Sequence, residues 1–439
     1  MLKLIKPELP GGVKDYLPSA MIAREQMLAT IKQIYESFGF VPLGTPAIEK
    51  LETLTGNDPS FNMNLFHAKI VQGPKAETLK YEGSDMALRF DHTVPLARIM
   101  AQYPHDLPKP FKRYAVGPVW RGEKPQAGRF REFWQFDADI VGSNSILADT
   151  EIVQIIYQIM KALGFQDFVI RINNRKILNR LAEIANFGEA EKKEGVFRIL
   201  DALEKLPREE IKNLLLEILN PDQAKKVLDF CRAETLEDAE SILGSNRGTD
   251  ELREISQNLE TLEVANWKID LSIARGLGYY TGPVFETNLP NWKKGSVYSG
   301  GRFDGLSNRF APDSNIPAVG ASVGVDRLFV AMQDLGMIKN KLTSTQVLIA
   351  LFDKNLIPEY LKLAQELRSA GIRTELYPDQ ESFRTQIAYT AKQEIPILMI
   401  MGSDEKSTGK VTIRDMRTRR QKTVNKSEIL AMINKQLAH

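Results

Sequence analysis

The 439-residue sequence predicts an α+β protein: an antiparallel sheet domain that carries a helical insertion and is followed by a small α/β domain. Two runs of β-forming residues between 111 and 142 flank a turn-forming stretch, which predicts an antiparallel hairpin. Residues 174–262 are rich in Leu, Glu, Lys and Ala at helical spacing. From residue 345 onward, apolar strand-like runs alternate with amphipathic helical runs, a pattern typical of parallel strands joined by helices.

These patterns set the expected domain boundaries. A chain of this length is expected to form two or three domains. Residues 1–173 and 263–335 make the predicted sheet domain, 174–262 the helical insertion, and 345–439 the small α/β domain. The polar stretch 339–345 is the expected linker before the last domain.

Composition excludes several kinds of site. Hydrophobic residues make up 43% and charged residues 26%, as in ordinary soluble domains. The net charge of +2 means that any site for a polyanion must be a local patch. The single cysteine, Cys231, excludes a disulfide framework and a multi-cysteine zinc site, and we expect it to be a small buried residue. Neither a signal-peptide core nor an apolar run of membrane length is present, so we expect a cytoplasmic protein without a membrane partner.

The first predicted elements are a helix over 19–38, ended by Gly39, and an extended piece that begins at 40–42. A helix followed by an edge strand suits a dimer interface, and a helix packed within one subunit explains the same pattern. In 88–98, Asp91 and Thr93 lie two residues apart on one side of an extended segment, and Pro95 suits a first helical position. Asp91 or Thr93 is equally interpretable as a helix cap.

The hairpin within 111–142 carries the main candidate site. Arg121 and Glu123 alternate with apolar or small residues, as do Gln135, Asp137 and Asp139, so each set lines one face of its strand. Fixed guanidinium groups beside fixed carboxylates suit a ligand with one anionic and one cationic part. A salt-bridged sheet surface without a ligand is the alternative.

Further elements follow in order. A helix is expected over 148–163, and strands over 168–173 and 267–271. Residues 274–286 combine three glycines with Tyr279 and Tyr280, which suits a close wall for a small ligand, and a glycine-punctuated hairpin without a ligand explains the stretch equally well. A glycine-rich strand and turn follow at 297–306, and a strand that runs into a helix at 319–328.

The C-terminal region is predicted to contain strands at 347–351, 374–377 and 397–401, with helices at 356–370 and 382–392. Residues 401–439 contain nine Lys or Arg and four Asp or Glu, a local balance of +5. A basic edge of this kind suits a phosphate backbone, and an ordinary solvated face is the alternative.

Several of these stretches, in order, resemble the histidyl-tRNA synthetase family of class II aminoacyl-tRNA synthetases. Residues 121–142 resemble its motif 2, and 19–42 and 319–328 resemble motifs 1 and 3. Residues 88–98, 275–282 and 300–306 are similar to the family segments LRYDLTVPLAR, RGLDYYTG and GGRYDGL. Three residues depart from the pattern: His92 replaces an apolar residue, Gly278 an aspartate and Asp326 a glutamate.

The resemblance implies a catalytic domain at 1–173 and 263–335, an anticodon-binding domain at 345–439, and a homodimer. It implies that histidine and ATP, with Mg²⁺, form histidyl-adenylate and pyrophosphate, and that the histidyl group then passes to the 3′ end of tRNA(His). By motif position, the implied catalytic residues are Arg121 and Arg275, and the implied ATP-binding residues are Arg121, Glu123, Arg129 and Arg327. The implied histidine-binding residues are Asp91, Thr93, Arg121, Gln135, Asp139, Arg275, Tyr279 and Tyr280.

Two rival interpretations use the same scaffold. A synthetase paralogue that acts as a regulatory subunit of ATP phosphoribosyltransferase would be expected to lose the motif arginines and the C-terminal domain, whereas this sequence has both. A non-catalytic tRNA-binding protein is favoured only by the departures Gly278 and Asp326. Histidine-dependent exchange between ATP and pyrophosphate separates the synthetase from both rivals.

Overall fold

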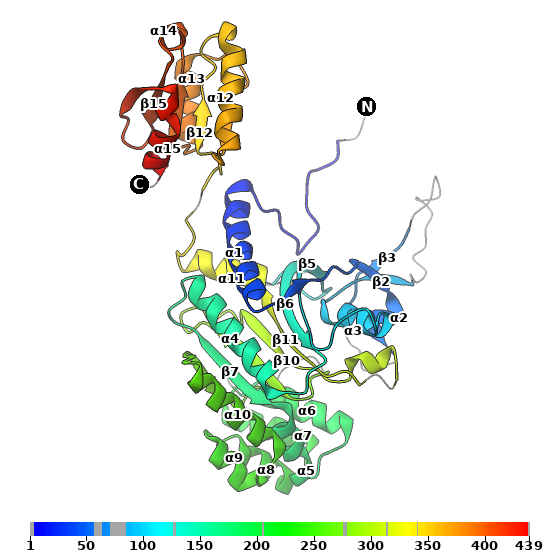
Figure 1. Cartoon of the computed structure of the whole chain (residues 1–439). Coiled ribbons are helices and arrows are strands. Elements are labelled where there is room, and N and C mark those ends of the chain that lie inside the picture. Colours follow the sequence, from blue (N-terminus) through cyan, green and yellow to red (C-terminus); the bar gives the residue numbers. More distant parts are fainter. Residues whose placement is uncertain are drawn as a thin grey trace. The chain divides into compact units, whose positions relative to one another are not determined.

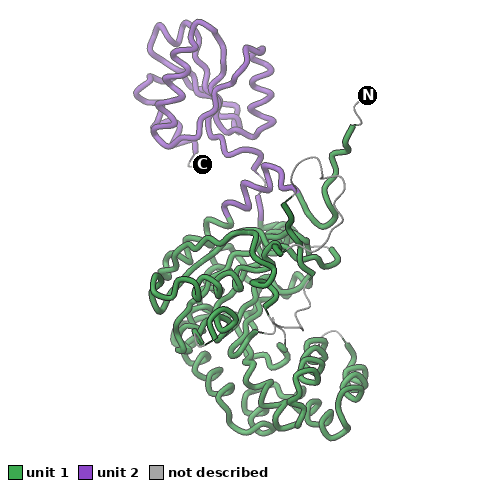
Figure 2. The backbone as a smooth tube through the Cα atoms, turned by 90° about the vertical axis from the view of Figure 1, so that its right-hand side faces the viewer, with its two compact units in different colours: residues 1–14, 27–337 green, residues 15–26, 338–439 purple. Residues whose placement is uncertain are grey.

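The computed structural model describes residues 4–56, 64–70, 85–125, 129–203, 206–274, 279–312, 315–339 and 341–437. The chain forms two compact units, shown in two colours in Figure 2. The first comprises Met1–Lys14 and Met27–Met337, and the second Asp15–Gln26 and Ile338–His439. Each unit has its own sheet, as the sequence predicts for the two ends of the chain.

The first unit is built on a sheet of eight described strands (Figure 1). Neighbouring strands are antiparallel except at the two edges, where β1 pairs with β5 and β7 with β8 in parallel. The predicted hairpin is confirmed, since β5 and β6 pair antiparallel over their whole length. In sheet order the strands are β1 (Val41–Pro42), β5 (Phe111–Trp120), β6 (Glu132–Val141), β11 (Ala318–Gly324), β10 (Tyr298–Arg302), β9 (Pro283–Asn288), β7 (Val169–Asn174) and β8 (Trp267–Ile269).

Helices α4 (Ile146–Ala162) and α11 (Val325–Asp334) pack against the middle strands of this sheet. Ile152, Ile156 and Ile159 recur at helical spacing on α4 and are fully buried, so this apolar stripe fixes which face of the helix meets the sheet. The Ser145 hydroxyl begins α4 by accepting the N–H of Leu147. Helix α1 (Pro18–Ser37) ends before Gly39, close to the predicted boundary.

A buried ion pair joins α4 to β10. The Arg302 guanidinium donates to both carboxylate oxygens of Asp149, and also to the carbonyl oxygens of Ser143 and Ser145 at 2.9 and 3.1 Å. Both side chains are almost completely buried. Arg302 belongs to the glycine-rich 297–306 stretch, and here it clamps the start of α4.

The described part of the insertion is all-helical, as predicted (Figure 1), and its helices pack in the succession α6, α7, α8, α9, α5 and α10. Cys231 ends α8 and is only partly buried, so the prediction of a buried residue was wrong, because a residue at a helix end is less enclosed than one on the apolar face. Desolvation still raises the pKa of its thiol to about 12. The helices are α5 (Arg175–Ile184), α6 (Ala190–Leu200), α7 (Arg208–Ile218), α8 (Pro221–Phe230), α9 (Leu236–Leu243) and α10 (Arg247–Thr261).

A small three-stranded sheet flanks the hairpin. Its strands, in sheet order, are β2 (Ile48–Lys50), β4 (Met86–Leu88) and β3 (His67–Ala68). Helix α2 (Leu51–Thr55) follows β2, and α3 (Thr93–Gln102) follows β4. Pro95 is the third residue of α3 and not the first, because Asp91 provides the cap and the helix begins at Thr93. The short 3-10 helix η2 (Leu306–Arg309) contacts α3.

The second unit has a five-stranded sheet in the order β13 (Thr374–Leu376), β12 (Val347–Ile349), β14 (Ile397–Ile400), β15 (Lys410–Asp415) and β16 (Gln421–Asn425). The first three strands are parallel, as predicted. The last two are antiparallel, and the sequence pattern missed them because their many charged residues alternate with few apolar ones. Buried Val411, Ile413 and Val424 attach this hairpin to the core. The helices are η3 (Lys354–Leu356), α12 (Ile357–Ser369), α13 (Phe383–Lys392), α14 (Ser403–Ser407), η4 (Lys426–Glu428) and α15 (Ile429–Leu437).

Candidate functional site

Two adjoining cavities lie over the middle strands of the large sheet, with volumes of about 240 and 270 Å³. They share the side chains of Arg121, Gln135 and Ser322, together with Ser296 and Ser299, so one wall divides them. Strands β6, β10 and β11 contribute to both. The cavities are therefore two halves of one site.

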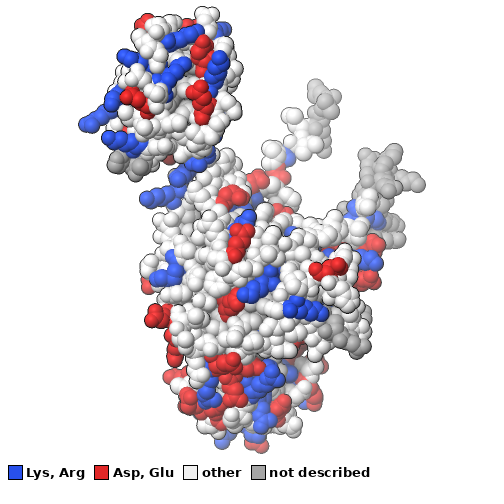
Figure 3. Space-filling model, in the orientation of Figure 1, with Lys and Arg blue, Asp and Glu red and all other residues white. Residues whose placement is uncertain are grey.

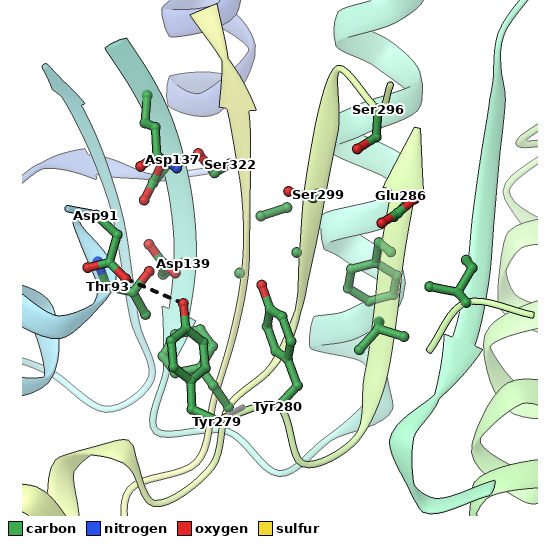
Figure 4. Close-up of a pocket in the computed structure, with 18 of the residues that line it drawn as sticks. Asp91, Thr93, Asp137, Asp139, Tyr279, Tyr280, Glu286, Ser296, Ser299 and Ser322 are labelled. Carbon is green, nitrogen blue, oxygen red and sulfur yellow. Dashed lines mark hydrogen bonds between the residues drawn. The ribbon is translucent and has the colours of Figure 1, made fainter. Parts of the chain in front are cut away.

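The first cavity gathers the described members of the predicted amino-acid site (Figure 4). Asp91 and Thr93 approach from the start of α3, and Tyr279 and Tyr280 from the chain before β9. Arg275 and Gly278 lie outside the described residues. The predicted residues that line this cavity are Asp91, Thr93, Arg121, Gln135, Asp139, Tyr279 and Tyr280.

Asp91 has two tasks, one for each carboxylate oxygen. Its Oδ1 accepts the backbone N–H groups of Thr93 and Val94 at 3.2 and 3.0 Å, which caps α3. Its Oδ2 accepts the Tyr279 hydroxyl at 3.5 Å, the contact dashed in Figure 4. Burial raises the pKa of Asp91, while these backbone N–H groups and Arg121 act to lower it. From the sequence, Asp91 could be interpreted either as a helix cap or as a ligand contact. The structure shows that one Asp91 side chain can do both.

Strand β6 presents Gln135, Asp137 and Asp139 to the cavity, as period two predicts. Gln135 Nε2 donates to Ser322 Oγ at 2.7 Å, which fixes the amide. Asp139 lies opposite Arg113 in the hairpin register, and its Oδ2 is 2.8 Å from Arg113 Nη2. Burial raises the pKa of Asp139 to about 6, although Arg113 acts to lower it. Arg113 gives no signal of its own in the sequence, and the pairing of the two strands identifies it as the partner of Asp139.

Glycine at position 320 makes room for Asp139. The two residues are paired across β11 and β6, and a Cβ atom at 320 would collide with Asp139 Oδ1. A Cβ atom at position 300, on the next strand, would likewise collide with the carbonyl oxygen of Gly320. Close strand approach at these glycines therefore creates the floor of the cavity.

The tyrosines form an aromatic wall. The Tyr279 and Tyr280 rings are 5.1 Å apart at an interplanar angle of 66°, and Tyr279 also packs edge-on against Phe303 at 6.1 Å. Burial raises the pKa of both hydroxyls, so they remain neutral and can donate hydrogen bonds. Both tyrosines line the cavity, as the first of the two sequence interpretations expects, but their rings are tilted to one another and do not form a single plane.

The second cavity is lined by the predicted nucleotide residues Arg121, Glu123, Arg129 and Arg327. Glu123 and Arg129 form an ion pair with each other. The Arg121 guanidinium lies 5.1 Å from the Phe133 ring centre, and its Nε donates to the Phe90 carbonyl at 3.2 Å. Arg327 Nη1 donates to the Ser296 carbonyl at 3.0 Å. The arginines are thus oriented by fixed contacts beside an open volume.

The other two departures from the family pattern have visible structural roles. Asp326, at the start of α11, is buried, and its Oδ2 accepts the Trp134 N–H at 2.5 Å, so the shorter acid still ties α11 to β6. His92 lies behind the site, with Nε2 3.3 Å from the Gly117 carbonyl oxygen. Burial, Arg89 and Arg113 lower the pKa of His92 to about 3, so its ring is neutral.

Known proteins match this chain over nearly its whole length. Residues 12–328 match the family model described as histidyl-tRNA synthetase, and residues 346–436 match an anticodon binding domain. A histidine–tRNA ligase of Wolinella succinogenes is 40% identical over 98% of both chains. One of Rhodopirellula baltica is 41% identical over 96% of both.

Solved structures give the same result. The histidyl-tRNA synthetase of Nostoc sp. PCC 7120 has a TM-score of 0.86 and 33% identity, covering 99% of this chain and 100% of that one. A Bacillus halodurans protein described as an ATP phosphoribosyltransferase regulatory subunit/histidyl-tRNA synthetase has a TM-score of 0.73 at 21% identity and covers 91% of this chain and 100% of that one, which indicates a shared fold. The chain therefore belongs to the histidyl-tRNA synthetase family.

Proposed function

We propose that the chain is a histidine–tRNA ligase, which activates histidine with ATP and transfers it to tRNA(His). The observation that carries this proposal is the division of the site. One half is acidic and aromatic, the other contains arginines, and Arg121 lines both. Such a pair of cavities suits an amino acid and a nucleotide held with their reacting groups at the shared wall.

In the amino-acid half, we assign Asp91, Gln135 and Thr93 to the α-ammonium group. Asp139 accepts the imidazole N–H, and Tyr279 and Tyr280 bound the ring. A site that pairs each polar atom of its ligand can reject analogues that lack one by factors of roughly 10⁴. This pairing would select histidine over amino acids of similar size.

In the nucleotide half, the histidine carboxylate attacks the α-phosphorus of ATP, and the bond to pyrophosphate breaks. Negative charge builds on the phosphate oxygens during this step, so fixed cations accelerate it. We assign Arg121 and Arg275 to the carboxylate and the α-phosphate, Arg129 and Arg327 to the outer phosphates, and Glu123 to the adenine end. Arginine suits these contacts because its planar fork binds phosphate in bidentate fashion. Arg275 is outside the described residues, and its role stays a prediction.

The donor set is compatible with Mg²⁺ arriving with ATP. Among the described residues no three His, Cys, Asp or Glu side chains cluster as a metal site. Mg²⁺ in nucleotide sites is held chiefly by phosphates and water, with one or two carboxylates. Asp326 lines the second cavity and would supply one such carboxylate. When bound, the ion would neutralise phosphate charge.

The partners belong to the same proposal. The C-terminal unit would bind the anticodon end of tRNA(His) with its basic residues, several of which Figure 3 shows in blue on one face.

We propose a homodimer through the β1–β5 edge, where Val41 and Val116 are 48% and 42% exposed. Because charging of tRNA serves translation, we propose a cytoplasmic location. Separately, none of the described helices is long and apolar enough to cross a membrane.

Amino-acid-dependent exchange of pyrophosphate into ATP tests the proposal. We expect exchange with histidine and background rates with phenylalanine or glutamine. Arg121→Ala should abolish exchange, whereas Arg198→Ala, which removes an exposed arginine of the insertion, should not. A wild-type protein that binds histidine without supporting exchange would favour the regulatory-subunit interpretation.

A further inference from the structure

One short junction, Asn173–Arg175, contacts the chain on both sides of the segment that carries the two tyrosines of the first cavity. The junction lies where β7 ends and α5, the first helix of the insertion, begins. Asn173 is completely buried, and its side-chain amide donates to the carbonyl oxygens of Leu271 and Ile273 at 3.1 and 2.8 Å. The junction therefore fixes the chain that leads into this segment.

The wall segment, residues 274–282, includes both tyrosines of the cavity, and Arg175 contacts its two ends. The Arg175 backbone N–H donates to the Gly282 carbonyl oxygen at 2.8 Å. Its side-chain Nη1 donates to the Ala274 carbonyl oxygen at 3.3 Å. A single residue at the start of the insertion thus joins the beginning and the end of the wall segment.

The insertion also orients the Arg175 side chain. The guanidinium carbon lies 4.3 Å from the ring centre of Phe197 on α6, and this ring is 3% exposed. Burial lowers the pKa of Arg175, while Glu194 acts to raise it. The described partners of the guanidinium are therefore an aromatic ring and a backbone carbonyl oxygen, and the ring decides the direction in which the side chain extends.

The two ends of the wall segment are not held equally. Near its end, the Thr281 N–H donates to the Arg302 carbonyl oxygen at 2.8 Å, and Thr281 Oγ1 accepts the Asp304 N–H at 3.0 Å, so β10 also fixes this end. At the beginning, the hydrogen bond that the Ala274 carbonyl accepts from the described residues comes from Arg175. Loss of the Arg175 guanidinium should therefore loosen the Ala274 end more than the other.

Building on the proposed histidine site, we propose that Arg175 is a positioning residue, which Phe197 orients and which places Tyr279 and Tyr280 by holding the Ala274 end of the wall segment. Arg175 lines neither half of the site, so it acts through the segment and does not touch the substrate. The helical insertion consequently takes part in binding the amino acid through α6, although every residue assigned to histidine belongs to the sheet domain.

The main test is Arg175→Met in the full-length protein, assayed by pyrophosphate exchange at varied histidine and fixed ATP. Methionine keeps an unbranched chain beside Phe197 but cannot donate a hydrogen bond. The KM for histidine should rise roughly three- to tenfold, the effect expected for the loss of one hydrogen bond, while the KM for ATP changes little. Arg175→Lys keeps a cation and a donor, so it should restore most of the affinity for histidine.

Lys193→Met is the matched control. The Lys193 ammonium lies 5.9 Å from the centre of the same Phe197 ring, and burial lowers its pKa too, but it has no hydrogen bond to the described part of the wall segment. This variant should keep the wild-type KM for histidine. Phe197→Leu should raise this KM in the wild-type background and leave it unchanged in the Arg175→Met background, because the ring acts through Arg175.

The outcomes distinguish positioning from stability. An unchanged KM for histidine in Arg175→Met, with a lowered unfolding temperature, overturns the inference and leaves Arg175 a residue that only stabilises the insertion. If Arg175→Met does not fold, equal KM values for histidine in Phe197→Leu and Lys193→Met overturn it instead. Equal effects of Phe197→Leu in both backgrounds contradict the orientation of Arg175 by the ring. Wild-type protein without histidine-dependent exchange would contradict the proposed function and not this inference.

Discussion

The Asp139 carboxylate carries two interactions that a substitution would separate. It faces the amino-acid cavity, and it is the nearest carboxylate to Arg113, which is 1% exposed. Gly320 leaves the space in which this carboxylate lies. Substrate affinity and stability are therefore linked at this residue.

We predict that Asp139→Ala raises the KM for histidine roughly tenfold or more, because the imidazole N–H loses a charged acceptor, while the KM for ATP changes little. Arg113 becomes an uncompensated buried charge, so unfolding free energy should also fall, by up to about 3–5 kcal/mol if Asp137 offers no compensation. Asp139→Asn should be milder, because it keeps an acceptor. Pyrophosphate exchange at varied histidine and thermal unfolding measure the two effects.

A rise in the KM for ATP without a rise in the KM for histidine would contradict this assignment of Asp139. If the alanine variant loses ATP affinity and keeps its histidine KM, Asp139 belongs to the nucleotide half and the division of the hairpin is wrong. The cavity geometry makes a clear distinction possible, since Asp139 lines the first cavity and is absent from the lining of the second.

At this scale the sequence predicted well which side chains share a face. Gln135 and Asp139 both line the first cavity because the two-residue period of a strand is a local property. Arg113 and Ser322 were missed because their positions depend on strand pairing, which brings together residues distant in the sequence.

At the scale of elements, the glycine-rich 297–306 stretch divides into two functions. Gly300 and Ser299 line the first cavity, whereas Arg302 clamps the start of α4 through Asp149. The family motif covers the whole stretch, so the resemblance alone cannot tell the cavity-lining residues from Arg302. The structure distinguishes the two roles. The C-terminal hairpin β15–β16 was missed for a related reason, because alternating charged residues resemble a solvated loop when their strand partners are unknown.

We predict that Arg302→Met destabilises the protein by about 3–5 kcal/mol, because Asp149 loses its cation while remaining buried. Burial already raises the pKa of Asp149 to about 6, above its unfolded value, so the folded state binds the proton more tightly and stability falls as pH rises through this range. The loss should consequently be larger at pH 8 than at pH 5. Denaturant unfolding at both pH values measures it.

The double variant Arg302→Met with Asp149→Leu serves as the control, since it removes both charges and should recover part of the stability. Equal losses for the single and double variants would mean that packing, and not the unpaired carboxylate, dominates.

At the scale of the whole molecule, each unit has its own sheet and buried core. The second unit buries Val347, Ile349 and Met399 in a cluster that consists of its own residues. All described residues assigned to histidine and ATP lie before residue 328, in the first unit. Strand and helix alternation, unlike residue pairing, is readable along the chain, and it predicts a separate C-terminal domain from residue 345, whereas it gives no signal that Asp15–Gln26 belongs to the second unit.

Ending the chain within the predicted linker, after residue 339, should therefore separate the two steps of the reaction. Histidine-dependent pyrophosphate exchange should persist, because its residues remain, whereas tRNA charging should fall sharply with loss of the +5 segment from 401 to 439. Both activities are measured on the same preparation, with the full-length chain as control. Unchanged charging would remove the C-terminal unit from tRNA recognition. Loss of both activities, with a lowered unfolding temperature, would mean instead that this unit stabilises the fold of the rest, because a separate tRNA-binding role predicts an intact first step.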